Sequence, residues 1–263
     1  MPTRYHATGN PLDLTTNPTV PKPVTLIEVA GGRDLTLHDR RLFNTLLANA
    51  YQRIEADEEH SIRLADLRRL AMRETAESPH QANERLDASI TRLMRLILNY
   101  DTLDSEGEHW RCKSPLIGFA RYSEKRDILY YEFPKQLRPL LVDPALHSRI
   151  RLSVIYQFES KYSLILYEIL QRHADRRGPC WVWTPEIDDL RRLIGVEDKL
   201  PNYGDLDKRV LHPAQVEINA HAEFNVTYEP IRAGGPKTTR GRGSKVLKVE
   251  FTVTRKETAQ AKK

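Results

Sequence analysis

The stretch Asp66-Leu-Arg-Arg-Leu70 recurs as Asp189-Leu-Arg-Arg-Leu193, 123 residues further along the chain. Five identical residues can coincide in a chain rich in Leu and Arg, but the surrounding sequence extends the match. At the same offset three apolar residues fall on apolar residues (Leu42, Leu46 and Leu47 on Ile165, Ile169 and Leu170). A fixed offset of this kind indicates a tandem duplication, with about 110–120 residues in each unit.

The N-terminal copy predicts three helices followed by strands. Thr36-Leu-His-Asp39 has the form of a capping box and precedes apolar residues at helical spacing. A second helix fits residues 65–73. A third helix runs from about residue 80 to 100, begins after Ser78-Pro79 and carries one apolar stripe (Leu86, Ile90, Leu93 and Ile97). Strand-like segments follow at 109–112, 117–122 and 128–133.

The C-terminal copy repeats this plan. Apolar residues in steps of three and four predict one long helix (Leu152, Ile155, Phe158, Tyr162, Ile165 and Ile169). Cys180-Trp-Val-Trp183 predicts a strand, and Thr184-Pro185 predicts the start of a helix that ends at Gly195. A last helix fits Tyr203 to Asn219, with a kink or a fresh start at Pro213. Two strands with strict alternation follow (224–229, with Phe224, Val226 and Tyr228 inward, and 247–254, with Leu247, Val249, Phe251 and Val253 inward).

Three helices followed by a β-hairpin form the plan of a winged helix, which is a helix-turn-helix with an added wing. We therefore predict an α+β fold with two tandem winged-helix domains. The domains are expected at 26–145 and 146–255, joined by a linker near Asp143–Arg149. Five prolines in the first 23 residues predict a flexible arm over 1–25. Order is expected to begin with a strand at Val24–Val29, and 256–263 form a basic tail.

Composition excludes several classes of protein. The chain has 263 residues, 40% hydrophobic and 29% charged, which is typical of soluble globular proteins and not of disordered or fibrous ones. No apolar run approaches the roughly 18 residues of a transmembrane helix. The first ten residues lack the pattern of a signal peptide, and Cys112 and Cys180 form neither a CxxC zinc site nor a disulfide framework. We therefore expect a cytoplasmic protein.

The net charge of +5 is concentrated at one end. Residues 231–263 hold ten Lys and Arg against two Glu, a balance of +8, whereas the other 230 residues carry a balance of −3. A polyanion that touches the C-terminal end is therefore the expected partner, although a solvated basic tail would give the same charge.

The second helix of a helix-turn-helix fits the major groove, so the plan predicts which residues face DNA. In the C-terminal copy Leu206 and Val210 must face the core. The opposite face then carries Lys208, His212 and Gln215, flanked by Asp205 and Arg209. In the N-terminal copy the outward residues are Gln81, Arg92 and Arg95, with Arg85 at the edge. Any of these side chains could instead belong to a solvated helix face.

The link between the last two strands is the predicted wing. Residues 231–244 contain four glycines, four basic residues and no acid. Glycine permits close approach of the backbone to a surface, and basic residues would neutralise phosphates and make binding dependent on salt. The predicted wing contacts are Arg232, Lys237, Arg240, Arg242 and Lys245.

Three stretches of the C-terminal copy resemble the iteron-binding plasmid replication initiators (Glu159-Ser-Lys-Tyr-Ser-Leu-Ile-Leu-Tyr-Glu-Ile-Leu170, Leu190-Arg-Arg-Leu-Ile-Gly-Val196 and Tyr203-Gly-Asp-Leu-Asp-Lys-Arg-Val-Leu-His-Pro-Ala-Gln-Val-Glu-Ile-Asn219). The resemblance is dense over about 150–254. Over 30–145 the order of elements matches better than the residues. By resemblance, Lys208, Arg209 and the wing fall where family members contact DNA. Asp205 and Asp207 stand where some relatives are more basic.

The resemblance implies an initiator with two winged-helix domains that bind direct repeats in double-stranded DNA at a plasmid origin. It implies monomers that open the origin and help to recruit the host initiator and the replicative helicase. It also implies dimers, joined mainly through the N-terminal domain, that repress the initiator's own promoter.

The sequence lacks the motifs of an enzyme. It contains no GxSxG and no HExxH, and its histidines show no two-His metal spacing. Gly235-Pro-Lys-Thr-Thr-Arg-Gly241 lacks the residue order of a phosphate-binding loop and lies between strands. We therefore expect no catalysis, no cofactor and no metal. Two alternatives to an initiator stay open: a tandem winged-helix transcriptional regulator without a role in replication, and a winged-helix adaptor that binds protein.

Overall fold

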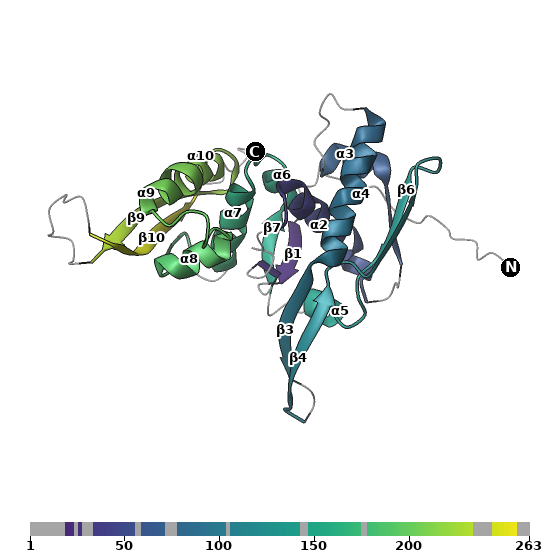
Figure 1. The fold of residues 1–263 in the computed structure, drawn as a ribbon, viewed down its shortest axis with the longest axis horizontal. Coiled ribbons are helices and arrows are strands. Elements are labelled where there is room, and N and C mark those ends of the chain that lie inside the picture. Colours follow the sequence, from purple (N-terminus) through teal and green to yellow (C-terminus); the bar gives the residue numbers. More distant parts are fainter. Residues whose placement is uncertain are drawn as a thin grey trace, which may run out of the picture. The chain divides into compact units, whose positions relative to one another are not determined.

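The computed structural model describes residues 19–23, 26–27, 34–55, 59–71, 78–103, 106–142, 147–174, 178–233 and 244–256. The chain divides into two compact units, unit 1 up to Tyr156 and unit 2 from Gln157 onward. In each unit helices pack around a small sheet (Figure 1). The boundary therefore lies later in the chain than the one expected at 145/146.

Unit 1 begins with a strand where the sequence predicted a flexible arm. β1 (Thr19–Pro23) pairs antiparallel with β7 (His147–Arg151), so part of the expected linker is also a strand. β1 contains two prolines, which a two-stranded ribbon tolerates because one edge of each strand needs no partner. Leu26 and Ile27, inside the strand expected at 24–29, are helical and buried. The expected arm is therefore wrong at 19–23, the expected linker at 147–149 and the expected strand at 26–27. Residues 1–18 lie outside the described part of the chain.

The helices of unit 1 begin where the sequence predicted. α2 (Leu37–Ala50) starts with the expected capping box, in which Thr36 Oγ1 accepts from the Asp39 N–H at 3.2 Å and the Asp39 carboxylate accepts from the Thr36 N–H at 2.7 Å. A 3₁₀ turn follows at Tyr51–Arg53. The first copy of the repeat forms α3 (Leu64–Leu70).

α4 (Pro79–Arg95) starts after the predicted Ser78-Pro79, with a second capping box. It ends at Arg95 instead of near 100, because the chain continues as β3 (Ile97–Leu103). Ile97 therefore leaves the apolar stripe, and its side chain is 46% exposed.

The two units share one sheet topology. Unit 1 has the order β2 (His60–Arg63), β6 (Ile128–Glu132), β5 (Phe119–Ser123), and unit 2 has the order β8 (Cys180–Trp183), β10 (Val246–Arg255), β9 (Phe224–Arg232). All neighbours are antiparallel, and the last strand in the sequence lies in the middle of each sheet. This common order agrees with the duplication inferred from the repeat.

Besides the β1–β7 ribbon, a hairpin of unit 1 has no counterpart among the described strands of unit 2. Between α4 and β5, unit 1 contains β3 and β4 (His109–Pro115), which pair only with each other and project from the body of the unit (Figure 1). A short helix, α5 (Arg138–Val142), follows β6. The sequence had predicted the strand β4 but not its partner β3.

The long helix predicted from Leu152 to Ile169 is broken at the boundary between the units. α6 (Leu152–Ile155) closes unit 1, and α7 (Lys161–Ala174) follows in unit 2. Arg41 of α2 donates to the carbonyls of Ile155 at 3.3 Å and Tyr156 at 3.1 Å, and so holds the end of α6. These carbonyls would otherwise be unpaired at a helix end.

The segment just before α7 is capped by the side chain of Glu217, a residue of the same unit. The Glu217 carboxylate accepts from the N–H groups of Glu159 at 2.7 Å and Ser160 at 3.4 Å. Phe158 just before them is fully buried. The apolar spacing therefore continues through a non-helical segment, which explains why the sequence suggested one helix.

The second copy of the repeat forms α8 (Ile187–Ile194). It begins later than Thr184-Pro185 suggested, because the Pro185 carbonyl accepts from the Val249 N–H at 3.2 Å and keeps this segment beside the sheet. It ends at Gly195 as predicted. There φ is +76°, a left-handed conformation that glycine adopts without a Cβ clash.

The strands of unit 2 bury the alternating residues as predicted, except that Tyr228 is half-buried and Leu247 is exposed. Phe224 stacks on Tyr167 with a centroid distance of 5.7 Å and meets Trp181 edge-on at 5.6 Å, and all three side chains are buried. Leu247 was expected to face inward but is 40% exposed, because the register shifts between Val246 and Lys248.

Candidate nucleic-acid interface

The predicted recognition helix of unit 2 is a continuous helical segment with one widened turn. α9 (Tyr203–Leu206) leads into a π-helical turn at Asp207–Leu211 and then into α10 (His212–His221). The His212 N–H donates to the carbonyl of Asp207, five residues earlier. In a regular α-helix the ring of Pro213 would collide with the carbonyl four residues before it, so the widened turn accommodates the proline. Leu206 and Val210 face the core as predicted.

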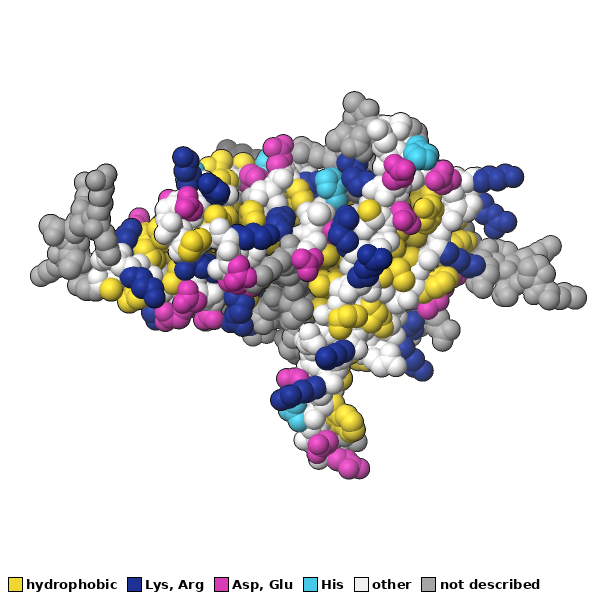
Figure 2. Space-filling view, in the orientation of Figure 1, with side chains coloured by type: hydrophobic (Ala, Val, Ile, Leu, Met, Phe, Trp, Pro, Cys, Tyr) yellow, Lys and Arg dark blue, Asp and Glu magenta, His cyan; other side chains and the backbone are white. Residues whose placement is uncertain are grey.

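Lys208, Arg209 and His212 are exposed on the opposite face. Asp205 is half-buried, and its carboxylate lies 4.0 Å from Nε of Arg209. An exposed pair of this kind contributes about 0–1 kcal/mol, so Arg209 can exchange this carboxylate for another anion at little cost. Figure 2 shows basic and acidic side chains intermixed over the described residues of the face in view.

Gln215 is half-buried and does not lie on the outward face that the sequence predicted. Its Nε2 donates to the Val226 carbonyl at 3.0 Å. Asn219, one turn later, donates to the same carbonyl at 3.0 Å and accepts from the Val226 N–H at 2.7 Å. Because β9 is an edge strand, these bonds satisfy backbone groups that have no strand partner. They also fix the recognition helix to β9, the strand that leads into the wing.

We expect the Asn219→Ala substitution to lower the stability of unit 2 by about 1–2 kcal/mol. The Val226 N–H would lose its acceptor, whereas the Val226 carbonyl would keep Gln215 as a donor. Hydrogen exchange of the β9 amides in the full-length chain measures the effect. Val216→Ala on the exposed side of α10 is the matched control, and equal exchange in both variants would contradict the assignment.

The base of the wing is formed by the facing ends of β9 and β10. The Ala233 N–H donates to the Lys245 carbonyl at 2.9 Å, and Arg232 Nη1 donates to the Ser244 carbonyl at 2.9 Å. Arg232 and Lys245 are exposed here, as the prediction of wing contacts requires. The other predicted wing residues, Lys237, Arg240 and Arg242, lie outside the described residues.

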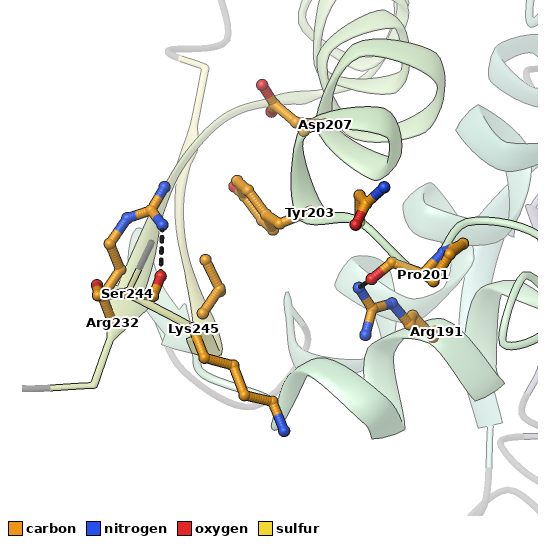
Figure 3. A pocket seen from close by; sticks show the side chains of 10 residues that line it. Arg191, Pro201, Tyr203, Asp207, Arg232, Ser244 and Lys245 are labelled. Atoms are coloured by element: carbon orange, nitrogen blue, oxygen red, sulfur yellow. Dashed lines mark hydrogen bonds between the residues drawn. The ribbon is translucent and has the colours of Figure 1, made fainter. Parts of the chain in front are cut away.

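A pocket of about 510 Å³ lies between the start of the recognition helix and the base of the wing (Figure 3). Its lining comes from α8, from the segment 201–207 and from both strands of the wing (Arg191, Pro201, Asn202, Tyr203, Gly204, Asp207, Arg232, Ser244, Lys245 and Val246). The Tyr228 hydroxyl donates to Asp207 Oδ1 at 2.5 Å. Burial, followed by the nearby Asp207 carboxylate, raises the pKa of both Tyr203 and Tyr228 above its ordinary value, so both phenols stay protonated.

In unit 1 the side chains of the predicted DNA-facing residues differ in exposure and in their contacts. Arg95 is exposed at the end of α4, and Arg85 is half-buried. Gln81 is exposed, but its side chain accepts from the Ser78 N–H at 3.1 Å as part of the capping box. Whether Gln81, Arg85 and Arg95 contact DNA stays a prediction.

Arg92 does not point outward, and its predicted placement is wrong. Its guanidinium binds the Asp39 carboxylate through two bonds of 2.8 and 2.9 Å, and thereby joins α4 to α2. Burial acts to raise the pKa of Asp39, but hydrogen bonds from Arg92, Ser89 and Thr36 outweigh it and hold this pKa below its ordinary value. The Asp39 side chain is fully buried and that of Arg92 is 37% exposed, so the guanidinium covers a buried carboxylate from the surface.

Two residues at the interface were missed in the sequence. Val216 is 55% exposed on α10, and it follows Lys208 and His212 in steps of four, a spacing that could have placed it on the same face. Arg191 of α8 lines the pocket, and no sequence signal connects it with the wing. Among the described residues no group of three or more His, Cys, Asp or Glu is placed to hold a metal, and no helix is long and apolar enough to cross a membrane.

The repeated topology and the exposed basic helix beside a wing define a tandem winged-helix protein. Comparison with protein families assigns the chain to a narrower class within these proteins. Residues 19–171 match the family described as Initiator Replication protein, WH1, and residues 186–253 match Initiator Rep protein, WH2. The chain therefore belongs to the family of initiator replication proteins. No curated protein sequence matches it closely enough to add to this assignment.

Solved structures show the same fold. The Pi initiator protein, solved in complex with iteron DNA, aligns with 92% of this chain and 99% of its own, at 19% identity and a TM-score of 0.71. Domains 2 and 3 of RctB align with 84% of this chain and 82% of their own, at 10% identity and a TM-score of 0.50.

Proposed function

We propose that this protein is a plasmid replication initiator that binds direct repeats in double-stranded origin DNA. The observation that carries the proposal is the exposed basic face of the recognition helix in unit 2, fixed beside a wing whose base is also basic. Membership of the initiator family and the shared fold of the Pi initiator, which was solved with iteron DNA, support it.

The recognition helix of unit 2 would enter the major groove with Lys208, Arg209 and His212 toward the bases. Lys and Arg pair with guanine, and Asp205 can accept from the amino group of cytosine. Arg232 and Lys245 at the base of the wing would contact the flanking phosphates. Unit 1 would place α4, with Gln81, Arg85 and Arg95, in the next major groove of the same repeat.

The consequences for replication form the finer part of the proposal. The bound monomer would open the origin and recruit the host initiator and the replicative helicase. The dimer, joined mainly through unit 1, would repress the initiator's own promoter. Family membership supports these steps.

Footprinting on the repeats that flank the protein's own gene tests the proposal. We expect protection over two successive major grooves, roughly 10 bp apart. We also expect affinity to fall steeply between low and moderate salt, because several phosphates are neutralised. Protection confined to one helical turn would contradict docking by both units. Absence of any preference for the repeats over scrambled duplex would contradict the proposed function itself.

Replication separates an initiator from a transcriptional regulator, because both would bind repeats. A plasmid that carries the origin but lacks its own initiator should replicate only when this protein is supplied. Failure to replicate despite binding to the repeats would favour the regulator. An adaptor that binds only protein would show no affinity for the repeats at all.

A further inference from the structure

The pocket beside the wing differs from the outward face of the recognition helix in its chemistry. Three cationic side chains, Arg191, Arg232 and Lys245, surround it, and Asp207 contributes its one carboxylate. Figure 3 shows that these cations come from three separate elements, α8, β9 and the segment that leads into β10. Asp207 already accepts the Tyr228 hydroxyl, which disperses part of its negative charge. The net positive charge of the side chains that line the pocket therefore favours the binding of an anion.

Arg191 is held in a fixed position, unlike a solvated surface arginine. Its side chain is 13% exposed, and Nη2 donates to the Pro201 carbonyl at 2.7 Å. Nη1 lies 3.3 Å from Asp188, whose side chain is 81% exposed, and the buried Nε has no hydrogen-bond partner among the described residues. A guanidinium carries five N–H donors, so this one retains donor capacity. A fixed guanidinium of this kind suits an anion with several oxygens.

On the opposite side of the pocket, Arg232 is exposed but has two contacts. Arg232 is held by the Ser244 carbonyl, and its guanidinium carbon lies 5.9 Å from the centre of the Tyr203 ring. The pocket lies between the start of the recognition helix and the wing, the two elements that straddle a DNA backbone in the proposed complex. A phosphodiester that passes between them would run along the pocket that these three cationic side chains line.

We propose that this pocket binds one phosphate group of the DNA backbone, with Arg191 as its buried ligand and Arg232 and Lys245 on the wing side. The inference rests on the proposed function, because it takes the phosphate from the bound duplex. The contact is independent of sequence, and it would set how deeply the recognition helix enters the groove.

Arg191→Gln tests the inference through the salt dependence of binding. Loss of one phosphate contact should reduce the slope of log K against log salt by about 1 and weaken binding about tenfold, on repeat DNA and on scrambled duplex alike. Arg191→Lys, which keeps the charge but loses the planar fork, should retain the slope and lose part of the affinity. Arg192→Gln is the matched control, since this exposed neighbour pairs with Asp189 at 2.7 Å and does not line the pocket.

Duplexes with single neutral methylphosphonates locate the contact. We expect wild-type protein to lose affinity at one phosphate beside the recognition groove, and Arg191→Gln to show no further loss there. An unchanged slope and an unchanged methylphosphonate profile in Arg191→Gln would overturn the inference. Saturable binding of inorganic phosphate that Arg191→Gln abolishes, with DNA binding unaffected, would also overturn it, because the site would then serve a free anion.

The two proposals fail in distinguishable ways. If wild-type protein binds repeats and scrambled duplex equally, the proposed function is wrong. The pocket assignment still stands in that case if Arg191→Gln lowers the slope on scrambled duplex, and it falls if the slope is unchanged.

Discussion

Replacing Arg92 with alanine should lower the stability of unit 1 by about 3 kcal/mol. The substitution would leave the Asp39 carboxylate, whose side chain is fully buried, without the guanidinium that binds it at 2.8 and 2.9 Å. Arg92 is itself 37% exposed, but removing it is costly because the carboxylate that remains is fully buried and stays desolvated. The same carboxylate caps α2 through Thr36, so both α2 and α4 should be affected.

Hydrogen exchange of the α2 and α4 amides in the full-length chain measures this loss. Arg95→Ala is the matched control, because Arg95 is exposed three residues further along α4, and it should change the stability by less than about 0.5 kcal/mol. The pKa of Asp39 is depressed in the folded protein, so the stability it contributes is present above its ordinary pKa of 3.8 and is lost as the pH falls through the folded value. The difference between wild type and Arg92→Ala should therefore shrink below about pH 4. If Arg92→Ala lowered the stability at pH 7 by no more than Arg95→Ala does, the role of Arg92 as the partner of the buried Asp39 carboxylate would be contradicted.

Replacing Lys208 and Arg209 together with alanine should weaken binding to repeat DNA by about 100-fold. Each side chain is exposed on the recognition helix, and a good contact from such a residue to a base contributes about 1–3 kcal/mol. Because these contacts read the bases, the preference for repeats over scrambled duplex should fall with the affinity. Competition binding at fixed salt measures both quantities.

Arg69→Ala/Arg192→Ala is the control for net charge. These exposed arginines occupy equivalent positions in the two copies of the repeat, and each pairs with an Asp three residues before it. We expect this variant to keep its preference for the repeats. If Lys208→Ala/Arg209→Ala kept that preference as well, the recognition helix of unit 2 would not be the reader of sequence. The outcome also differs from that of Arg191→Gln, which should weaken repeat and scrambled DNA equally.

Local signals in the sequence were sufficient for the tandem winged-helix plan. The capping residues correctly predicted the starts of α2 and α4, and Gly195 correctly predicted the end of α8. These signals are reliable because a cap interacts with backbone groups only a few residues away in the sequence. The recurrence of Asp-Leu-Arg-Arg-Leu indicated the duplication that the two sheets share. Apolar spacing failed where it continued across an interruption, as at Ile97 and between Leu152 and Ile169.

The candidate site was harder to predict, because its geometry depends on contacts between distant residues. Helical periodicity predicted that Arg92 faces outward, because it could not show that Asp39, 53 residues earlier, would bind it. Gln215 was expected to face outward because the sequence gives no sign that Val226 needs a donor. The pocket combines Arg191 with Arg232 and Lys245, and only the fold brings these residues together.

The pairing of β1 with β7 has a consequence for the order of folding during synthesis. β1 is made before α2 and the three-stranded sheet of unit 1, whereas its partner, His147–Arg151, is made after them and just before α6. Val20 is fully buried in the finished fold, and its partner in the ribbon, Ile150, is absent until β7 has been made. A fragment that ended at residue 145 would never supply the partner, and it would also lack the α6 carbonyls that Arg41 holds. Unit 1 can therefore close only after β7 and α6, its last two elements, have been made.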